Sequence, residues 1–300
     1  MKPLAALILT CLLGTACSTP PKGGPPEARL TRRAAESHLA LANQAADRGN
    51  YPLALELLEE TRRLALSADY SPVLIQAALS RGAVLFFQGD RAGAEAAWQN
   101  ALEEAGYANQ RELAALCRIY MARGRLFAAI QNKDGPGRAT EVRSQVQAAL
   151  GIITKDAASI ALGWTVIGLA EKELGRWDEA ERALKKALAL YTEQGYWEQA
   201  GYAWYVIASV RSVAGRFAEA EAALKEALAC DRRAENGYAL GKDWMALGEV
   251  LAKAGKKQDA DAAYRRAAAI FRAIDREADA ARADAAQTNA AQTNAAGIEE

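Results

Sequence analysis

The chain has 300 residues, and its 37 basic side chains balance its 37 acidic ones, so it carries no net charge at neutral pH. A balanced chain has no net positive field to attract nucleic acid, which argues against that class of partner. One histidine and four cysteines form no Cys/His cluster along the sequence, so no metal site is predicted.

The first residues have the order of a secretory signal: a basic residue, a short apolar run from Leu4 to Leu13, and small residues before Cys17. The run is shorter than the roughly 20 apolar residues of a membrane-spanning helix. The segment Leu13-Gly14-Thr15-Ala16-Cys17 resembles a bacterial lipobox. This resemblance implies a signal peptide over 1–16 and a mature chain that begins at Cys17 and carries acyl chains such as palmitate. The other interpretation is a cleaved signal with an incidental cysteine.

The residue after this cysteine, Ser18, implies by the same resemblance the periplasmic face of the bacterial outer membrane. Proline and glycine then dominate up to Glu27, a composition that builds no packed core. We therefore expect residues 17–34 to be a tether. At the other end, residues 276–300 are expected to form a capping segment followed by a disordered tail.

Between these ends, glycine returns at a nearly constant interval, in steps of 40, 46, 40, 40 and 40 residues. A period of this length indicates a stack of similar units rather than one globular core. A glycine that ends each first helix in the left-handed conformation explains the spacing. The glycines are Gly49, Gly89, Gly135, Gly175, Gly215 and Gly255.

The last three units share one pattern: a tryptophan, then Ile-Gly, Ile-Ala or Leu-Gly, then the turn glycine, then Ala, a large apolar residue and Ala. The pattern resembles the tetratricopeptide repeat. The positions are Trp164, Ile167, Gly168, Gly175, Ala180, Leu184 and Ala187, then Trp204, Ile207, Ala208, Gly215, Ala220, Leu224 and Ala227, then Trp244, Leu247, Gly248, Gly255, Ala260, Tyr264 and Ala267.

This resemblance implies an all-α, right-handed superhelical solenoid of about six helix pairs over residues 35–275. Unit three fits the pattern least, because Thr140, Ser144 and Gln147 stand at its Ala, large apolar and Ala positions. We expect the superhelix to bend or break there. Its first helix should run from about Asn109 to Asn132, with a kink or break at Gly124.

No residue pattern points to catalysis, and we expect neither an enzyme nor a cofactor. His38 stands at the tryptophan position of unit one, so packing is favoured over chemistry. Cys117 and Cys230 belong to units three and five, too far apart for a disulfide, and should be buried free thiols.

By the same resemblance, the first helices line the concave groove. Aromatic and apolar side chains there are typical anchors for a partner peptide or helix. Phe86 and Phe87 have a second interpretation, packing against the long helix of unit three. The predicted groove residues are Phe86, Phe87, Leu162, Leu169, Tyr202, Tyr205 and Met245.

The sequence thus predicts an envelope-anchored scaffold or adaptor that binds protein partners through its concave groove. The resemblance associates such proteins with the assembly of pilus, secretin or outer-membrane complexes. The alternative is a small-molecule or lipid-binding accessory protein of a transporter.

Overall fold

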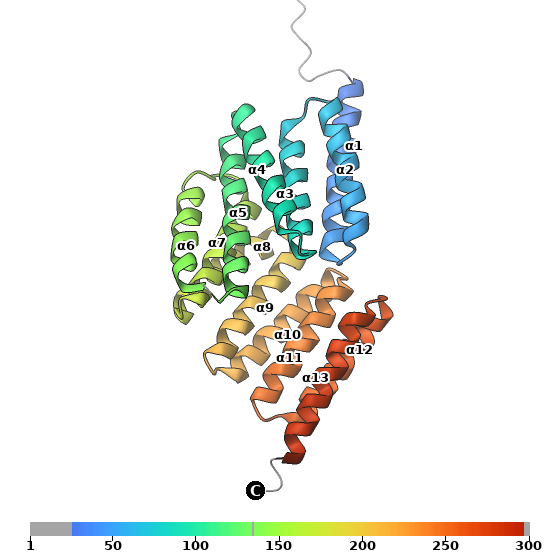
Figure 1. Ribbon diagram of the computed structural model, residues 1–300, viewed down its shortest axis with the longest axis vertical. Coiled ribbons are helices and arrows are strands. Elements are labelled where there is room, and N and C mark those ends of the chain that lie inside the picture. Colours follow the sequence, from blue (N-terminus) through green and yellow to red (C-terminus); the bar gives the residue numbers. More distant parts are fainter. Residues whose placement is uncertain (1–25, 134, 297–300) are drawn as a thin grey trace, which may run out of the picture.

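A computed structural model describes residues 26–133 and 135–296, and in those residues all regular structure is helical. The predicted signal peptide, Cys17 and most of the tether lie outside them. The expected all-α solenoid is confirmed, with six helix pairs and a final single helix (Figure 1). The first three pairs are α1 (Pro26–Asp47) with α2 (Tyr51–Ser67), α3 (Ser71–Phe87) with α4 (Arg91–Tyr107), and α5 (Arg111–Gln131) with α6 (Gly135–Leu150).

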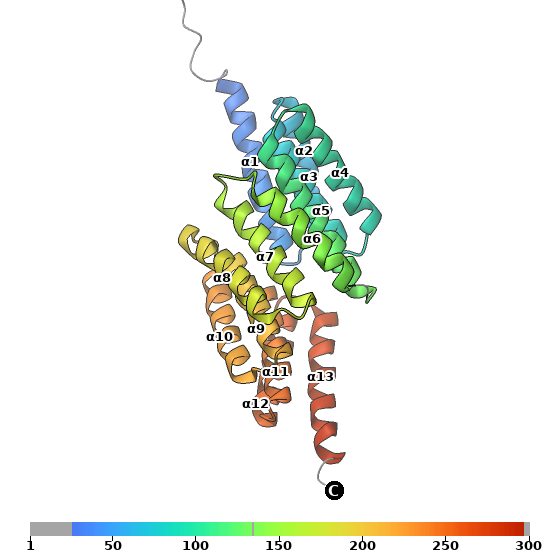
Figure 2. The ribbon, with the colours of Figure 1, turned by 90° about the vertical axis from the view of Figure 1, so that its left-hand side faces the viewer.

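The second half repeats the same arrangement with helices of 17 or 18 residues. The pairs are α7 (Ala157–Glu173) with α8 (Trp177–Gln194), α9 (Trp197–Val213) with α10 (Phe217–Arg233), and α11 (Gly237–Lys253) with α12 (Lys257–Ala273), followed by α13 (Glu277–Ala296). The helices lie side by side in chain order (Figure 2).

Five of the six glycines in the ladder have the left-handed backbone that the turn requires, with φ between 72° and 92°. Gly135 is the exception. It is the first residue of α6, and Lys133 has the positive φ in that turn. A second set of left-handed residues ends the second helices and was not predicted. Its members are Asp69, Asn109, Gly195, Glu235 and Asp275.

Inside three of the pairs, α3 with α4, α7 with α8 and α11 with α12, a large side chain from the second helix packs against a glycine of the first. A Cβ on Gly168 would stand 2.6 Å from Leu184, and one on Gly248 would stand 2.5 Å from Tyr264. Trp98 packs against two glycines, Gly82 and Gly124, and its indole Nε1 donates a hydrogen bond to the carbonyl of Leu79 at 3.1 Å.

This packing corrects the expectation for Gly124. Helix α5 runs unbroken from Arg111 to Gln131, and a Cβ at Gly124 would stand 2.4 Å from the ring of Trp98. The glycine therefore admits a tryptophan from the neighbouring unit, so its low helix propensity does not interrupt α5.

Unit three does not interrupt the core either. Helix α6 buries four apolar residues at spacings of three or four, and leaves Thr140, Ser144 and Gln147 exposed. A single apolar cluster extends from α3 to α12, and a smaller one joins α1, α2 and α3. The buried residues of α6 are Ala139, Val142, Val146 and Ala149.

The ends differ from the expected domain limits. Helix α1 begins at Pro26, inside the predicted tether, and α13 continues to Ala296 where a disordered tail was expected. The capping role of α13 agrees with its packing, because Ala280 and Ala283 are buried against Phe271 and its neighbours. Cys117 and Cys230 are buried free thiols, as expected.

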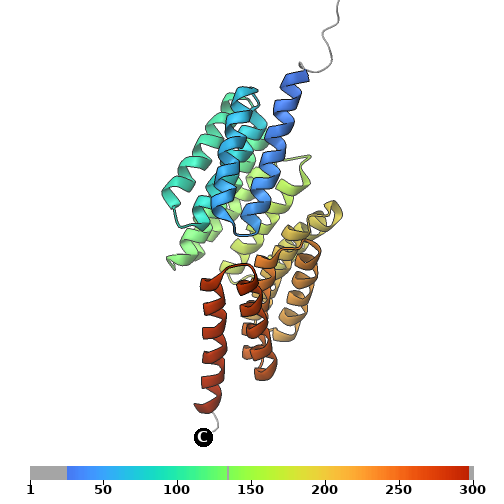
Figure 3. The ribbon, with the colours of Figure 1, turned by 90° about the vertical axis from the view of Figure 1, so that its right-hand side faces the viewer.

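The superhelix closes on itself, which the repeat pattern did not indicate. The turn between α1 and α2 meets the start of α11 and the residue that precedes α13 (Figure 3). Arg276 donates from Nη1 to the carbonyl of Gly49 at 3.1 Å, and Asn236 donates from Nδ2 to the carbonyl of Asp47 at 3.3 Å. The first pair thus contacts the last ones.

We predict that Gly82→Ala and Gly124→Ala each destabilise the fold by about 1–3 kcal/mol, the usual cost of overpacking a core. The added methyl group would collide with Trp98, whose hydrogen bond holds it in place. Thermal unfolding measures the effect. Gly106→Ala is the matched control, since a Cβ at this helical position meets nothing within 4 Å. Equal unfolding temperatures for all three variants would contradict the packing argument.

Candidate functional site

The closed superhelix surrounds a concave cavity of about 720 Å³. Its wall comes chiefly from the first helix of five pairs, α1, α3, α7, α9 and α11, together with the long helix α5. Because first helices line the inside and second helices the outside, side chains that are far apart in sequence face one another across the cavity. Seven tyrosines contribute to the wall: Tyr51, Tyr120, Tyr191, Tyr196, Tyr202, Tyr205 and Tyr238.

Four of the seven predicted groove residues lie at this cavity: Phe87, Leu162, Tyr202 and Tyr205. The rings of Tyr202 and Tyr205 are stacked, with centroids 6.4 Å apart. Their half-buried positions one turn apart on α9 suit the amphipathic character of tyrosine.

The other three predicted residues lie in packing contacts instead. Leu169 is buried in the main core, and Met245 packs between the main core and the cluster under α13. Phe86 is half-buried and contacts Trp98 and Phe127 with ring centroids about 6 Å away. Of the two interpretations, packing therefore describes Phe86. Phe87 is 54% exposed at the cavity wall.

Two basic side chains at the cavity have no carboxylate within 4 Å among the described residues. The guanidinium of Arg123, on α5, lies 5.5 Å from the ring centroid of Phe127 and 5.7 Å from that of Phe87. The Nζ of Lys242, on α11, lies 5.5 Å from the ring of Tyr238 and 5.8 Å from that of Tyr205. Burial lowers the pKa of Lys242. Both cations thus rest on aromatic faces and remain available to a ligand.

Acidic side chains occur in two contacting pairs beside them. Asp231, at the end of α10, and Asp243, on α11, are each 2% exposed. Burial raises the pKa of Asp231 to about 7. Burial, with the charge of Asp231 and a hydrogen bond to it, raises the pKa of Asp243 to about 9.

Gly201 makes this buried pair possible, since a Cβ there would stand 2.5 Å from Oδ1 of Asp231.

The second pair joins distant repeats: Asp47 at the end of α1 and Glu198 at the start of α9. Burial, followed by the hydrogen bond to Glu198, raises the pKa of Asp47 well above its usual value. Asp47 is exposed at the cavity wall, between the first pair and α9.

Metal ligands do not cluster in the described part of the chain. No group of three or more His, Cys, Asp or Glu side chains there is placed to hold a metal ion. His38 is half-buried, with Nδ1 2.8 Å from the carbonyl oxygen of Ala34 in the preceding turn. No described helix is both long and apolar enough to cross a bilayer.

Sequence reasoning missed Arg123 and both acid pairs. A signal in the sequence could have indicated these groups: charged residues inside the otherwise apolar stretch of a first helix, such as Lys242 and Asp243 beside Trp244. Two of the contacts, Asp47 with Glu198 and Asn236 with Asp47, depend on the closure of the superhelix, which the repeat pattern does not encode.

We predict that stability falls as pH rises from about 4 to 9. A carboxyl whose folded pKa is raised stabilises the folded state fully below its unfolded pKa, here near 3.8, and loses that contribution as pH rises through its folded pKa. The Asp243→Asn substitution keeps a hydrogen-bond donor for Asp231 and removes the group that titrates. It should raise the melting temperature at pH 9 by a few degrees, since about 1 kcal/mol shifts the melting temperature of a domain by about 2–4 °C.

Melting curves of the wild type and of Asp243→Asn at pH 5, 7 and 9 test this. Asp259→Asn, at an exposed carboxylate on α12, is the control and should leave the pH dependence unchanged. A wild-type melting temperature that rises towards pH 9 would overturn the assignment.

Comparison with known proteins agrees with this architecture. The sequence profile of the tetratricopeptide repeat matches residues 157–233. A search of curated protein sequences finds no match. Among solved structures, a Rap protein complexed with Competence and Sporulation Factor is similar over 87% of this chain and 76% of its own, with a TM-score of 0.53 and 16% identity.

BtubC from P. vanneervenii is similar over 80% of this chain and 92% of its own, with a TM-score of 0.54 and 19% identity. PilW, described as a widely conserved type IV pilus biogenesis factor, is similar over 83% of this chain and 95% of its own, with a TM-score of 0.50 and 16% identity. At these identities the likeness concerns the fold alone. Residues 157–233 match the tetratricopeptide repeat, and the helix pairs stacked from α1 to α12 form a tetratricopeptide-like solenoid.

Proposed function

We propose that this protein is a scaffold that binds a short segment of a partner protein inside its concave cavity. The proposal rests on two cations, Arg123 and Lys242, which lie on aromatic faces of the 720 Å³ cavity. Neither cation has a carboxylate partner among the described residues. Cavities of about 300–1,000 Å³ enclose ligands of drug size, which is also the size of a few peptide residues.

The chemistry of the wall suits a peptide. Tyrosine side chains offer flat apolar faces and hydroxyl groups. Arg123 and Lys242 can bind carboxylates or carbonyl oxygens of a ligand. The carboxyl groups of Asp231 and Asp243, whose pKa values burial raises to about 7 and about 9, can donate or accept hydrogen bonds with less negative charge than two ordinary carboxylates. One relative in fold is described as complexed with Competence and Sporulation Factor, and that description supports a bound factor as a use of such a cavity.

A small molecule is the second candidate, and the closure of the superhelix favours it. The contacts of Arg276 and Asn236 with the turn between α1 and α2 limit how long a chain can pass through the cavity. This supports the alternative role, a small-molecule or lipid-binding accessory protein of a transporter. Native mass spectrometry of the purified protein separates the two, because a co-purifying peptide and a co-purifying small molecule differ in mass and composition.

We also propose that the scaffold works at the periplasmic face of the outer membrane, anchored through lipid on Cys17. The lipobox-like segment before Cys17 supports this location. A fold relative described as a type IV pilus biogenesis factor supports pilus, secretin or outer-membrane complex assembly as the process served.

The cavity proposal predicts that Tyr202→Ala combined with Tyr205→Ala lowers partner capture from native envelopes at least tenfold. The double substitution removes the stacked wall on α9. Capture is measured by crosslinking and affinity purification, and circular dichroism checks the fold. Tyr107→Ala is the control, because Tyr107 is 91% exposed and away from the cavity. Arg123→Gln should reduce capture as well. Undiminished capture by both cavity variants would reject the cavity as the binding site.

The anchoring proposal predicts that Cys17→Ala moves the protein from the membrane fraction to the soluble fraction. Several acyl chains, at about 0.8 kcal/mol per buried CH₂, hold a protein firmly on a bilayer, and the substitution removes the residue that would carry them. Fractionation and immunoblotting measure the distribution. Cys11→Ala, within the apolar run, is the control. If the amount of protein in the membrane fraction is unchanged in Cys17→Ala, the proposal of a lipid anchor at Cys17 is wrong.

A further inference from the structure

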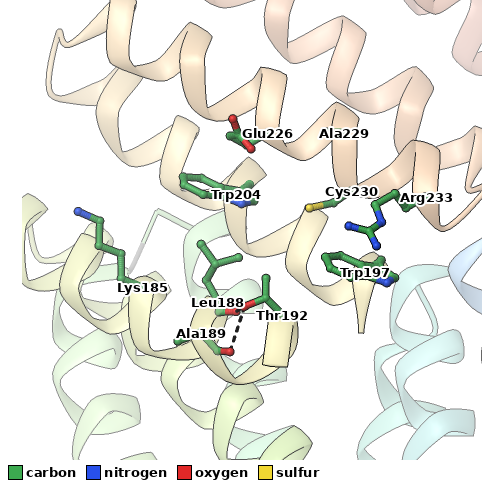
Figure 4. Close-up of a pocket in the computed structure, with 10 residues that line it drawn as sticks. All are labelled: Lys185, Leu188, Ala189, Thr192, Trp197, Trp204, Glu226, Ala229, Cys230 and Arg233. Carbon is green, nitrogen blue, oxygen red and sulfur yellow. Dashed lines mark hydrogen bonds between the residues drawn. The ribbon is translucent and has the colours of Figure 1, made fainter. Parts of the chain in front are cut away.

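A second recess, on the outer side of the molecule, lies between the second helices α8 and α10. Its volume is about 470 Å³, and it shares no residue with the concave cavity. Helix α9 forms its floor with two tryptophans, Trp197 and Trp204, while Tyr202 and Tyr205 of the same helix face the cavity. Figure 4 shows the remaining wall, in which Glu226 lies beside Trp204 and Arg233 lies over Trp197.

The preceding repeat shows what covers the equivalent tryptophan there. Trp164 occupies the same place on α7 as Trp204 on α9, and each is followed 22 residues later by a residue of the second helix (164 to 186, 204 to 226). In unit four that residue is Lys186, whose Nζ lies 3.9 Å from the centroid of the Trp164 ring. The chain thus supplies its own cation to the tryptophan of unit four.

In unit five the equivalent residue has the opposite charge. Glu226 cannot make a cation–π contact, and no basic side chain of the described residues lies over the Trp204 ring. Its carboxylate is exposed and has no ion-pair partner in the described part of the chain. The recess therefore has an aromatic face and a carboxylate at the place where its neighbour has a bound ammonium group.

The two basic residues at the recess are already engaged. The guanidinium of Arg233 lies 3.7 Å from the ring centroid of Trp197, and Lys185 pairs with Glu181 at 2.9 Å. Apolar side chains of Leu188, Ala189 and Ala229 complete the walls and suit the methylene chain of a long side chain. An ammonium on an aromatic face beside a carboxylate is a favourable arrangement for a cation.

We infer that this recess is a docking site for a lysine side chain of a partner protein, seated on Trp204 and paired with Glu226. The partner's ammonium takes the place that Lys186 occupies on Trp164. This site goes beyond the proposed use of the concave cavity, because it lies on the other side of α9 and uses different residues. A scaffold with both sites can hold two partners, or two parts of one partner, on opposite sides of the same repeats.

The test uses the full-length protein with two peptides, acetyl-Gly-Lys-Gly-amide and its norleucine analogue, which has the same length without the charge. Indole N–H signals of ¹⁵N-labelled protein are followed by NMR, with the Trp204 signal assigned from Trp204→Phe. The lysine peptide should shift the Trp204 signal with millimolar affinity and leave Trp164 unchanged. The norleucine peptide should bind at least fivefold more weakly. Equal binding of the two peptides would overturn the inference.

Two charge exchanges complete the test. Glu226→Lys places the protein's own ammonium over Trp204, as in unit four, and should weaken the lysine peptide at least tenfold. Lys186→Glu uncovers Trp164 and should create a second site, at which the Trp164 signal now shifts. Both positions are exposed, so neither change burdens the core. Unaltered binding in Glu226→Lys would exclude the recess as the lysine site, whatever the outcome at the concave cavity.

Discussion

The close approach of the two helices in each pair is the constraint on which the rest of the structure depends. In three pairs it is set where a large side chain of the second helix packs on a glycine of the first, as Leu184 does on Gly168 and Tyr264 on Gly248. Such contacts leave no room for a methyl group, so they define the distance between the helices. Repetition of this distance along the chain produces the curvature that turns the first helices inward.

That curvature creates the cavity and its unusual electrostatics. The first pair meets the last ones through Gly49 and Arg276, so the inner surface lies between packed repeats. Burial of charged groups there raises the free energy of their ionised forms. It raises the pKa values of Asp231 and Asp243, and the two cations lie on aromatic rings. The same repeats present a different chemistry outside, where Trp164 is covered by Lys186 and Trp204 has Glu226 beside it.

Periodicity made much of the fold predictable. The interval of the glycines and the pattern around Trp164, Trp204 and Trp244 indicated six helix pairs, and the structure confirms them. Predictions were poorer where a residue could have either of two structural roles. Gly124 was interpreted as a weak point in α5, although it admits Trp98 from another unit. Phe86 and Phe87 are neighbours in sequence, yet packing on Phe127 separates a half-buried ring from an exposed one.

The sequence by itself determined the repeat unit, because helix periodicity, small residues at close contacts and left-handed turns are local properties. It also indicated part of the cavity wall, since Tyr202 and Tyr205 follow from their positions in a first helix. Only the tertiary structure decided that the superhelix closes and that Asp47 meets Glu198 across it. The closing contacts join residues 189 and 227 positions apart, and they depend on small rotations accumulated over many repeats rather than on any single segment.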